Sequence, residues 1–293
     1  FGGKESQGNL PAIVAALAAK LTGRPAKLIY DRDDDFILTG KRHDFQISYK
    51  VGFEDDGLIN SVIVDQAMRC GMSWDLSEAI AARAMCHAEN SYFIKNMRIT
   101  SHRLKTNTQS NTAFRGFGGP QGIVGMERVI DHVAHHLNVD PLLVRERNFY
   151  PHKTSATHGI TPYGQTVHDC IIQDIISELK KTSDYADRRK DIEKFNKNSE
   201  FLKRGISLTP VKFGISFNAS FLNQAGALLH VYNDGSVYLN HGGTEMGQGL
   251  NTKIAQIVAN EFQLPLDAIK ITATSTGKVP NTSATAASSG SDL

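Results

Sequence analysis

The segment Phe45-Gln-Ile-Ser-Tyr-Lys-Val-Gly-Phe-Glu-Asp-Asp-Gly57 carries the clearest signal for the architecture of this chain. Apolar side chains recur at every second position from Phe45 to Val51, which is the period of a strand with one face in a hydrophobic core. The Asp55-Asp-Gly57 sequence that follows is typical of a tight turn between antiparallel strands. We therefore predict a β-hairpin over residues 44–69.

A second hairpin is predicted around Asn233-Asp-Gly235, which joins two short apolar runs. Apolar residues at helical spacing predict helices over residues 10–22, 120–137, 141–148, 171–179 and 250–262. Short apolar runs predict further strands over residues 27–30 and 269–272. Helices and strands are mixed irregularly and antiparallel hairpins are prominent, so the expected fold class is α+β rather than a doubly wound α/β sheet.

The chain is expected to contain two domains joined by a bridging segment. Residues 150–165 are rich in His, Thr, Gly and Pro without apolar periodicity, and residues 184–203 are heavily charged. A charge run of this kind is more often a solvated helix face than a binding surface. We place the domains at residues 1–149 and 206–293, with a bridging helical segment over residues 150–205.

The composition is that of a soluble globular protein, with 40% hydrophobic and 21% charged residues in 293. The net charge of +2 arises from 32 basic and 30 acidic side chains, which gives no reason to expect a nucleic-acid partner. No apolar run approaches the roughly 20 residues of a membrane span. Three cysteines without CxxC spacing favour a reduced, cytoplasmic setting. Because the first residue is Phe1 rather than methionine, we expect a fragment of a longer polypeptide.

Two glycine-rich segments, Thr112–Gly119 and Thr244–Gly249, predict loops that contact a ligand through the backbone. Glycine reaches positive φ at little steric cost, so such loops can place successive amides against phosphate or oxo groups. The first segment also leads into a helix N-terminus, which favours an anion. Two such loops suggest one large anionic cofactor, although ordinary tight turns are the alternative for either loop alone.

Several side chains near these loops are candidates for binding. Arg115 has a fixed donor fork that suits an oxo or phosphate group. Phe117 and Phe217 could hold a planar heteroaromatic ring between their faces, or could simply be core residues. The run Lys212–Phe217, taken alone, predicts a strand. The histidines around residues 132–136 lack the HExxH pattern, so a zinc site is not expected.

Five segments together closely resemble the molybdenum-binding part of the xanthine dehydrogenase and aldehyde oxidase family. They are Phe1–Glu5, Thr112–Gly122, Lys212–Phe217, Gly243–Gly249 and Pro280–Ser288, in the order that the family shows. The segment Leu222–Val231 makes a purine-oxidising member the nearest relative. The resemblance implies that the chain holds parts of two molybdopterin-binding domains.

The family resemblance also implies a molybdenum–molybdopterin cofactor. The residues that would approach it are Phe1, Gly2, Arg115, Met246, Gly247, Gln248, Thr285, Ala286, Ala287 and Ser288, of which Phe1, Arg115 and Ala287 would lie near the metal without ligating it. Water supplies the inserted oxygen in this family. Iron–sulfur clusters and FAD, through which electrons reach NAD, are expected on other domains or on partner chains.

Substrate contacts follow from the same resemblance. Glu5 would hydrogen-bond a purine, Arg83 would face its exocyclic oxygen, and Phe117 with Phe217 would enclose the ring. Arg83 taken alone is typical of a solvated helix arginine. Asn218 stands where purine oxidisers usually have threonine, so a hydroxyl contact to the substrate becomes an amide contact and the purine preference is expected to shift.

The expected function is hydroxylation of hypoxanthine or xanthine towards uric acid. The family's catalytic glutamate belongs to a motif that this chain lacks, so no catalytic residue is assigned here and the fragment alone is expected to be inactive. Expected partners are the purine, the remainder of the molybdenum subunit and an iron–sulfur and flavin portion. The alternatives are an enzyme oxidising aldehydes or other N-heterocycles, and a non-catalytic scaffold that binds a ligand or a subunit.

Overall fold

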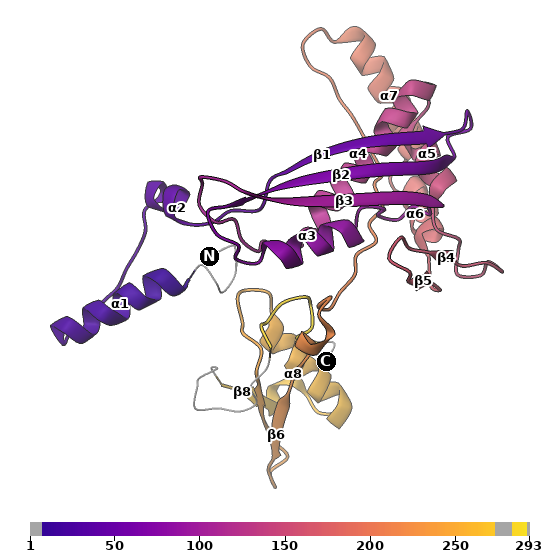
Figure 1. The fold of residues 1–293 in the computed structure, drawn as a ribbon. Helices are drawn as coiled ribbons and strands as arrows, with labels where there is room; N and C mark the ends of the chain where they lie inside the picture. The colour runs from indigo at the N-terminus through magenta and orange to yellow at the C-terminus, as the bar shows by residue number, and fades with distance from the viewer. Residues whose placement is uncertain (1–7, 273–282, 292–293) are drawn as a thin grey trace. The chain divides into compact units, whose positions relative to one another are not determined.

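A computed structural model of the chain describes residues 8–272 and 283–291 (Figure 1). The chain forms two compact units, the first ending at Phe213 and the second beginning at Gly214. In the first unit the helices are α1 (Asn9–Thr22), α2 (Arg32–Leu38), α3 (Ser77–Cys86), α4 (Gly119–Leu137), α5 (Pro141–Asn148), α6 (Ile172–Thr182) and α7 (Tyr185–Asn198). Its strands are β1 (Phe45–Phe53), β2 (Ile59–Gly71), β3 (Asn96–Lys105), β4 (Gly159–Ile160) and β5 (Thr166–Val167).

The sheet of the first unit has the order β1-β2-β3. β1 and β2 pair antiparallel, with Phe45 opposite Met68, so the hairpin predicted over residues 44–69 is confirmed. β2 and β3 pair in parallel, and α3 lies in the connection between them. Figure 1 shows α3 and α4 packed along this sheet. α3 and β3 had not been predicted.

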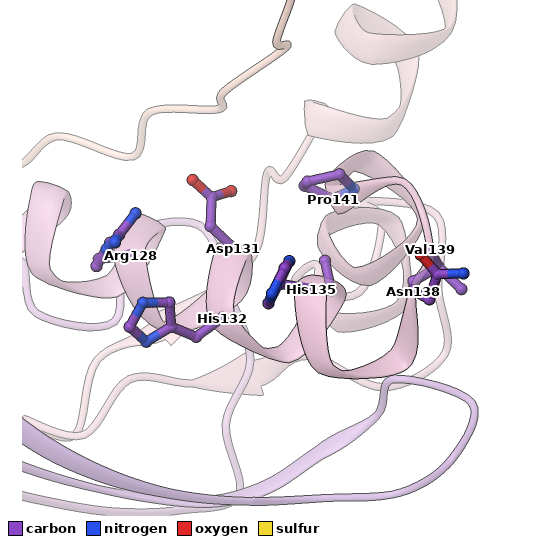
Figure 2. A pocket seen from close by; sticks show the side chains of 8 residues that line it. Arg128, Asp131, His132, His135, Asn138, Val139 and Pro141 are labelled. Carbon is purple, nitrogen blue, oxygen red and sulfur yellow. The ribbon is translucent and has the colours of Figure 1, made fainter. Parts of the chain in front are cut away.

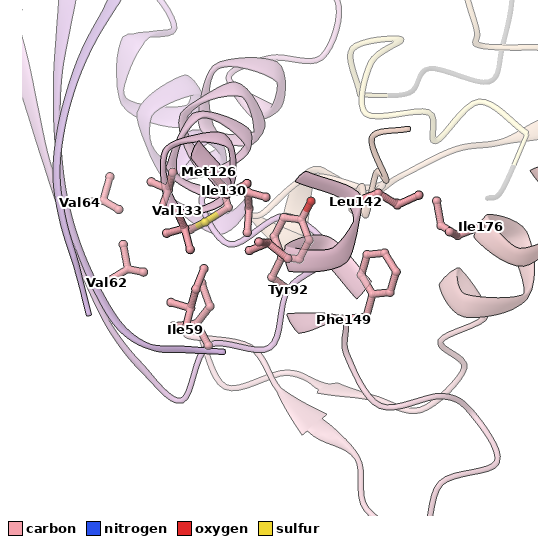
Figure 3. Packing of buried hydrophobic residues seen from close by; sticks show 14 of the residues in the cluster. Ile59, Val62, Val64, Tyr92, Met126, Ile130, Val133, Leu142, Phe149 and Ile176 are labelled. Carbon is pink, nitrogen blue, oxygen red and sulfur yellow. The ribbon is translucent and has the colours of Figure 1, made fainter. Parts of the chain in front are cut away.

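The main core lies between this sheet and α4 (Figure 3). Alternate residues of β2, including Val62 and Val64, meet Met126, Ile130 and Val133 from successive turns of α4. Residues further along the chain join the same cluster, namely Leu142 of α5, Ile176 of α6 and Tyr185 at the start of α7. The segment predicted as a bridge therefore adds side chains to the core of the first unit, while the predicted boundaries at residues 149 and 205 stay predictions.

Two glycines let the start of α4 approach α3 closely. A Cβ at Gly118 would lie 2.2 Å from the carbonyl oxygen of Ile80, and one at Gly122 would lie 2.3 Å from that of Ala84. Real side chains do not tolerate such distances to backbone atoms. Gly118 also has φ +95, which residues with a Cβ rarely adopt. The loop before α4 is thereby held against α3.

Two predictions of strands were wrong. Residues 27–30 and 212–217 have no regular secondary structure. Leu28 and Ile29 are exposed, and neither run pairs with another strand within the described residues. An apolar or β-branched run favours a strand only where a ladder partner is available. The predicted helix over residues 10–22 is confirmed by α1.

The second unit is a small sheet with one covering helix. Its elements are β6 (Ala227–Val231), β7 (Val237–His241), α8 (Leu250–Phe262) and β8 (Ile269–Ile271), with short 3₁₀ turns over Ser220–Leu222 and Leu266–Ala268. β6 and β7 pair antiparallel, which confirms the second hairpin, and β8 joins β7 in parallel. Val237 and Leu239 of β7 are fully buried against α8. In the described residues, no helix is both long and apolar enough to cross a membrane.

Candidate functional site

The loop Thr244–Gly249 connects β7 to α8 in the second unit. Gly247 has φ +92 and Gly249 has φ +75, and a Cβ at either position would meet nothing within 4 Å. The backbone conformation, rather than lack of space, therefore requires glycine at both positions. Residues 244–248 are all exposed, so the loop presents an open face.

The side chain of Gln248 hydrogen-bonds the backbone of its own loop. Its Nε2 donates to the carbonyl oxygen of Thr244 at 2.9 Å, and its Oε1 accepts from the amide of Met246 at 2.5 Å. The side chain that was predicted to contact the cofactor thus braces the loop in this structure. The backbone N–H of Gln248 has no hydrogen-bond partner among the described residues.

Glu245 organises the amides at the start of α8, and sequence reasoning gave it no role. Its Oε1 accepts from the amides of Gly247 at 2.8 Å and Gly249 at 3.1 Å, and its Oε2 accepts from the amide of Asn251 at 3.0 Å. The amide of Asn251, followed by those of Gly249 and Gly247, lowers the pKa of this carboxyl below its ordinary value. A glutamate shortly before a glycine that opens a helix was the signal that could have identified it.

The loop Thr285–Ser288 adjoins the first loop within the second unit. Thr285 Oγ1 accepts from the amide of Thr244 at 2.9 Å. Ala287 and Ser288 have φ of 56° and 58°, the left-handed region that residues with a Cβ adopt rarely. The carbonyl oxygen of Ala287 accepts from the amide of Ser216 at 2.8 Å. Hydrogen bonds therefore join the two loops and the residue that precedes Phe217.

The side chain of Asn223 holds the backbone of Phe217 through two hydrogen bonds. The Phe217 amide donates to Asn223 Oδ1 at 2.7 Å, and the Phe217 carbonyl oxygen accepts from Asn223 Nδ2 at 3.0 Å. The Phe217 side chain is half-buried, whereas Asn218 is exposed. The second unit thus brings together the segments that hold Phe217, Met246–Gln248 and Thr285–Ser288.

In the first unit, Arg83 lies on α3 with only 6% of its surface exposed, so it is not a solvated helix arginine. Its guanidinium carbon lies 5.8 Å from the ring centroid of Phe213. Burial lowers the pKa of Arg83, but an arginine remains protonated at neutral pH. Around it, His87 Nδ1 lies 2.8 Å from the Arg83 carbonyl oxygen, and the His87 ring packs 4.7 Å from that of Phe213.

The loop before α4 carries Arg115 and Phe117. Phe117 has φ +53 and packs against a small cluster that includes Ile80 and Ala81 of α3. Arg115 is exposed, and its carbonyl oxygen accepts from Arg42 Nη2 at 2.7 Å. Phe117 and Arg83 are therefore both organised around α3.

The predicted residues fall into three groups. Arg83, Arg115 and Phe117 belong to the first unit, with the loop Thr112–Gly119, and Phe217, Asn218 and the loops Thr244–Gly249 and Thr285–Ser288 belong to the second. Phe1, Gly2 and Glu5 lie outside the described residues. The pairing of Phe117 with Phe217 across a substrate ring stays a prediction.

A hollow of about 530 Å³ lies elsewhere on the first unit, along α4 and the start of α5 (Figure 2). Its lining includes Arg128, Asp131, His132 and His135, and none of the predicted site residues. Asp131 is already paired with Arg145 at 2.9 Å, and His132 Nδ1 hydrogen-bonds the Tyr49 hydroxyl. These polar groups are used within the fold, and the hollow gives no sign of a ligand site.

Sequence comparisons relate this chain to known proteins. Two sequence models described as molybdopterin cofactor-binding domains match residues 1–149 and residues 178–293. The chain is 47% identical over 293 residues to a xanthine dehydrogenase of Oryza sativa subsp. japonica. It is 45% identical over 293 residues to xanthine dehydrogenase 1 of Arabidopsis thaliana. Both alignments cover 100% of this chain and 21% of the relative, and they confirm the predicted resemblance.

Solved structures support the fold. A quinoline 2-oxidoreductase from Pseudomonas putida 86 has a TM-score of 0.79 and 22% identity, covering 95% of this chain and 36% of that chain. An aldehyde oxidoreductase from Desulfovibrio gigas has a TM-score of 0.76 and 25% identity, covering 94% of this chain and 29% of that chain. The predicted α+β class is confirmed by this likeness.

Proposed function

Because this chain belongs to the family of molybdopterin cofactor-binding domains, we propose that it forms part of the molybdenum site of an enzyme that hydroxylates hypoxanthine and xanthine towards uric acid. Identities of 47% and 45% to xanthine dehydrogenases, over the whole chain, support this choice of substrate. In each turnover one oxygen atom from water is added to a purine carbon, and two electrons and two protons leave. The electrons would pass through iron–sulfur clusters and FAD on other domains or chains to NAD, in the cytoplasm.

The observation that carries the proposal is the contact between the loops Thr244–Gly249 and Thr285–Ser288 in the second unit. The Thr244 amide and Thr285 Oγ1 are 2.9 Å apart, although 41 residues separate them in the sequence. A ligand rich in oxygen acceptors fits this surface, because the Gln248 N–H is available and the sides of Gly247 and Gly249 are open. Met246–Gln248 and Thr285–Ser288 would hold the molybdopterin, with Arg115 and Ala287 near the metal. When bound, the molybdenum centre supplies a two-electron oxidation.

Arg83 would stabilise the reacting purine. Its guanidinium is protonated and nearly excluded from solvent, so its attraction for negative charge is screened less than it would be in water. Placed opposite the purine's exocyclic oxygen, it would stabilise the charge that develops there as the ring is attacked. Glu5 would accept or share a purine proton, and Phe117 and Phe217 would exclude water from the two faces of the ring. Asn218 would contribute an amide contact.

The proposal is tested on the complete native enzyme that contains this chain. Molybdenum and pterin are quantified, and hypoxanthine is added without oxygen while flavin and iron–sulfur absorbance is followed. One molybdenum per chain and bleaching by hypoxanthine are expected. Molybdenum without bleaching would favour an aldehyde or another N-heterocycle as substrate, which the exposed Asn218 also allows. Absence of molybdenum and pterin would favour a non-catalytic binding scaffold.

A further inference from the structure

The shape of the loop Thr244–Gly249 depends on hydrogen bonds rather than on packing. Residues 244–248 are all exposed, and Met246 keeps 48% of its surface accessible. Cβ atoms at Gly247 and Gly249 would meet nothing, so no neighbouring side chain confines the backbone there. A loop without buried side chains retains one conformation only if its polar groups are tied together.

Glu245 makes three of these ties. Its carboxylate accepts from the amides of Gly247, Gly249 and Asn251, at 2.8, 3.1 and 3.0 Å. The carboxylate precedes Met246–Gln248 in the chain, and its bonds reach Gly247 inside that segment, Gly249 after it and Asn251 on the first turn of α8, so they close the loop onto the helix. Amides at a helix start commonly bind external anions, but here the chain's own carboxylate already occupies them.

We propose that Glu245 is a positioning residue for the cofactor, whose carboxylate holds Met246–Gln248 in the conformation that binds molybdopterin. This inference rests on the proposed function. The Gln248 N–H has no partner among the described residues, and its direction depends on the backbone of the preceding Gly247, which has φ +92 and is held by Glu245. Without the Glu245 bonds the loop would have to be ordered when the cofactor binds, and this ordering would weaken binding.

Three substitutions grade the loss of these bonds. Glu245→Gln keeps an oxygen for Gly247 and Gly249 but turns an NH₂ group towards the Asn251 amide. Glu245→Asp keeps the charge and shortens the reach by one methylene. Glu245→Ala removes all three bonds. The matched control is Glu261→Ala, which removes an exposed glutamate from α8 without touching the loop.

The experiment uses the complete enzyme and measures the rate at which molybdopterin is lost after dilution. The fluorescence of the released and oxidised pterin reports this loss. Glu245→Ala should lose the cofactor about tenfold faster than the parent enzyme, which corresponds to about one net hydrogen bond to a charged group. Glu245→Gln and Glu245→Asp should fall between the two, and Glu261→Ala should match the parent. Val258→Ala, a substitution in the core between α8 and its sheet, gives a destabilised variant with the carboxylate intact.

Equal cofactor loss from Glu245→Ala and the parent would overturn the inference. Equal loss from Glu245→Ala and Val258→Ala, at the same fall in melting temperature, would also overturn it, because Glu245 would then act only through stability. If the parent enzyme holds no molybdopterin at all, the proposed function fails and this inference fails with it. The first two outcomes leave the proposed function standing, so the two failures are distinguishable.

Discussion

The ammonium nitrogen of Lys212 lies 2.6 Å from Oε1 of Glu89, a carboxylate with no exposed surface. The backbone beside Lys212 is held as well, because its amide donates to Asn90 Oδ1 at 3.1 Å and Asn90 Nδ2 donates to the carbonyl oxygen of Pro210 at 2.9 Å. These contacts fix the segment just before Phe213, whose ring adjoins Arg83 and His87. The buried ion pair therefore supports the surroundings of the proposed substrate arginine.

Removing one member of this pair should destabilise the first unit. Lys212→Met leaves the Glu89 carboxylate fully buried without its partner and should reduce the free energy of unfolding by about 3 kcal/mol. Glu89→Gln should cost less, because Lys212 is partly exposed and keeps the Tyr163 hydroxyl at 3.2 Å. The double variant should lose less than the sum, because neither buried charge remains. Urea denaturation of all four proteins measures this coupling. Lys190→Met is the control, since its pair with Asp187 is exposed and should matter little. Strict additivity of the two single losses would contradict a coupled pair.

Stability should fall between pH 6.5 and pH 4 because of His87. Burial lowers the pKa of His87 to about 4 from an ordinary value of 6.5. The unfolded chain therefore binds a proton in this range before the folded chain does, so the contribution is complete above pH 6.5 and disappears as the pH falls through 4. The loss should be on the order of 3 kcal/mol. Unfolding followed across this range should show a shallower pH dependence for His87→Gln.

The exposed His135 provides the comparison for this experiment. His135→Gln should retain the slope of the parent protein between pH 6.5 and pH 4. If His87→Gln and the parent lose stability in parallel, another group is responsible for the acid sensitivity.

Local sequence patterns predicted the helices and strands that depend on interactions between residues near one another in the chain. The alternation from Phe45 to Val51 gave the hairpin because one face of the strand is covered by core residues. α3 was missed because it begins after Leu76 without a capping side chain, and β3 because it is rich in charged residues. The run at residues 27–30 had the composition of a strand but finds no partner strand in the described residues.

The site shows the same division between local and distant causes. Glycines marked the loops Thr112–Gly119 and Thr244–Gly249, since positive φ is a local requirement. The burial of Arg83 and the pairing of Lys212 with Glu89, 123 residues away in sequence, depend on packing that no local pattern records. Glu245 was overlooked because its function in the loop rests on backbone amides, which every residue possesses.

Gly122→Ala should destabilise the contact between α3 and α4. Alanine is favoured over glycine within a helix by about 1 kcal/mol. Here, however, the added Cβ would lie 2.3 Å from the backbone oxygen of Ala84, and overpacking of this kind costs about 1–3 kcal/mol or more. The steric effect should prevail, with a net loss of about 1–2 kcal/mol in thermal or urea unfolding.

Gly205→Ala is the appropriate control for that substitution. Its added Cβ meets nothing within 4 Å, and its φ is not positive. It should leave stability unchanged or raise it slightly, because alanine restricts the unfolded chain. A stabilising Gly122→Ala would show that α4 can move away from α3 without cost.

Arg83 provides the sharpest test of purine specificity in the complete enzyme. Arg83→Lys keeps a positive charge but lacks the planar fork, and Arg83→Met removes the charge at similar length. If the guanidinium stabilises charge on the purine's exocyclic oxygen, kcat/KM for hypoxanthine should fall by about 10²-fold in Arg83→Met and less in Arg83→Lys.

The molybdenum content of these variants should stay constant. Arg103→Lys, at a half-buried arginine of β3 that pairs with Glu78 at 3.1 Å, should behave like the parent. Because an aldehyde such as benzaldehyde has no exocyclic oxygen opposite the reacting carbon, its turnover should not fall with Arg83→Met. An equal loss for both substrates would instead assign Arg83 to the integrity of α3 and its neighbours Phe213 and His87.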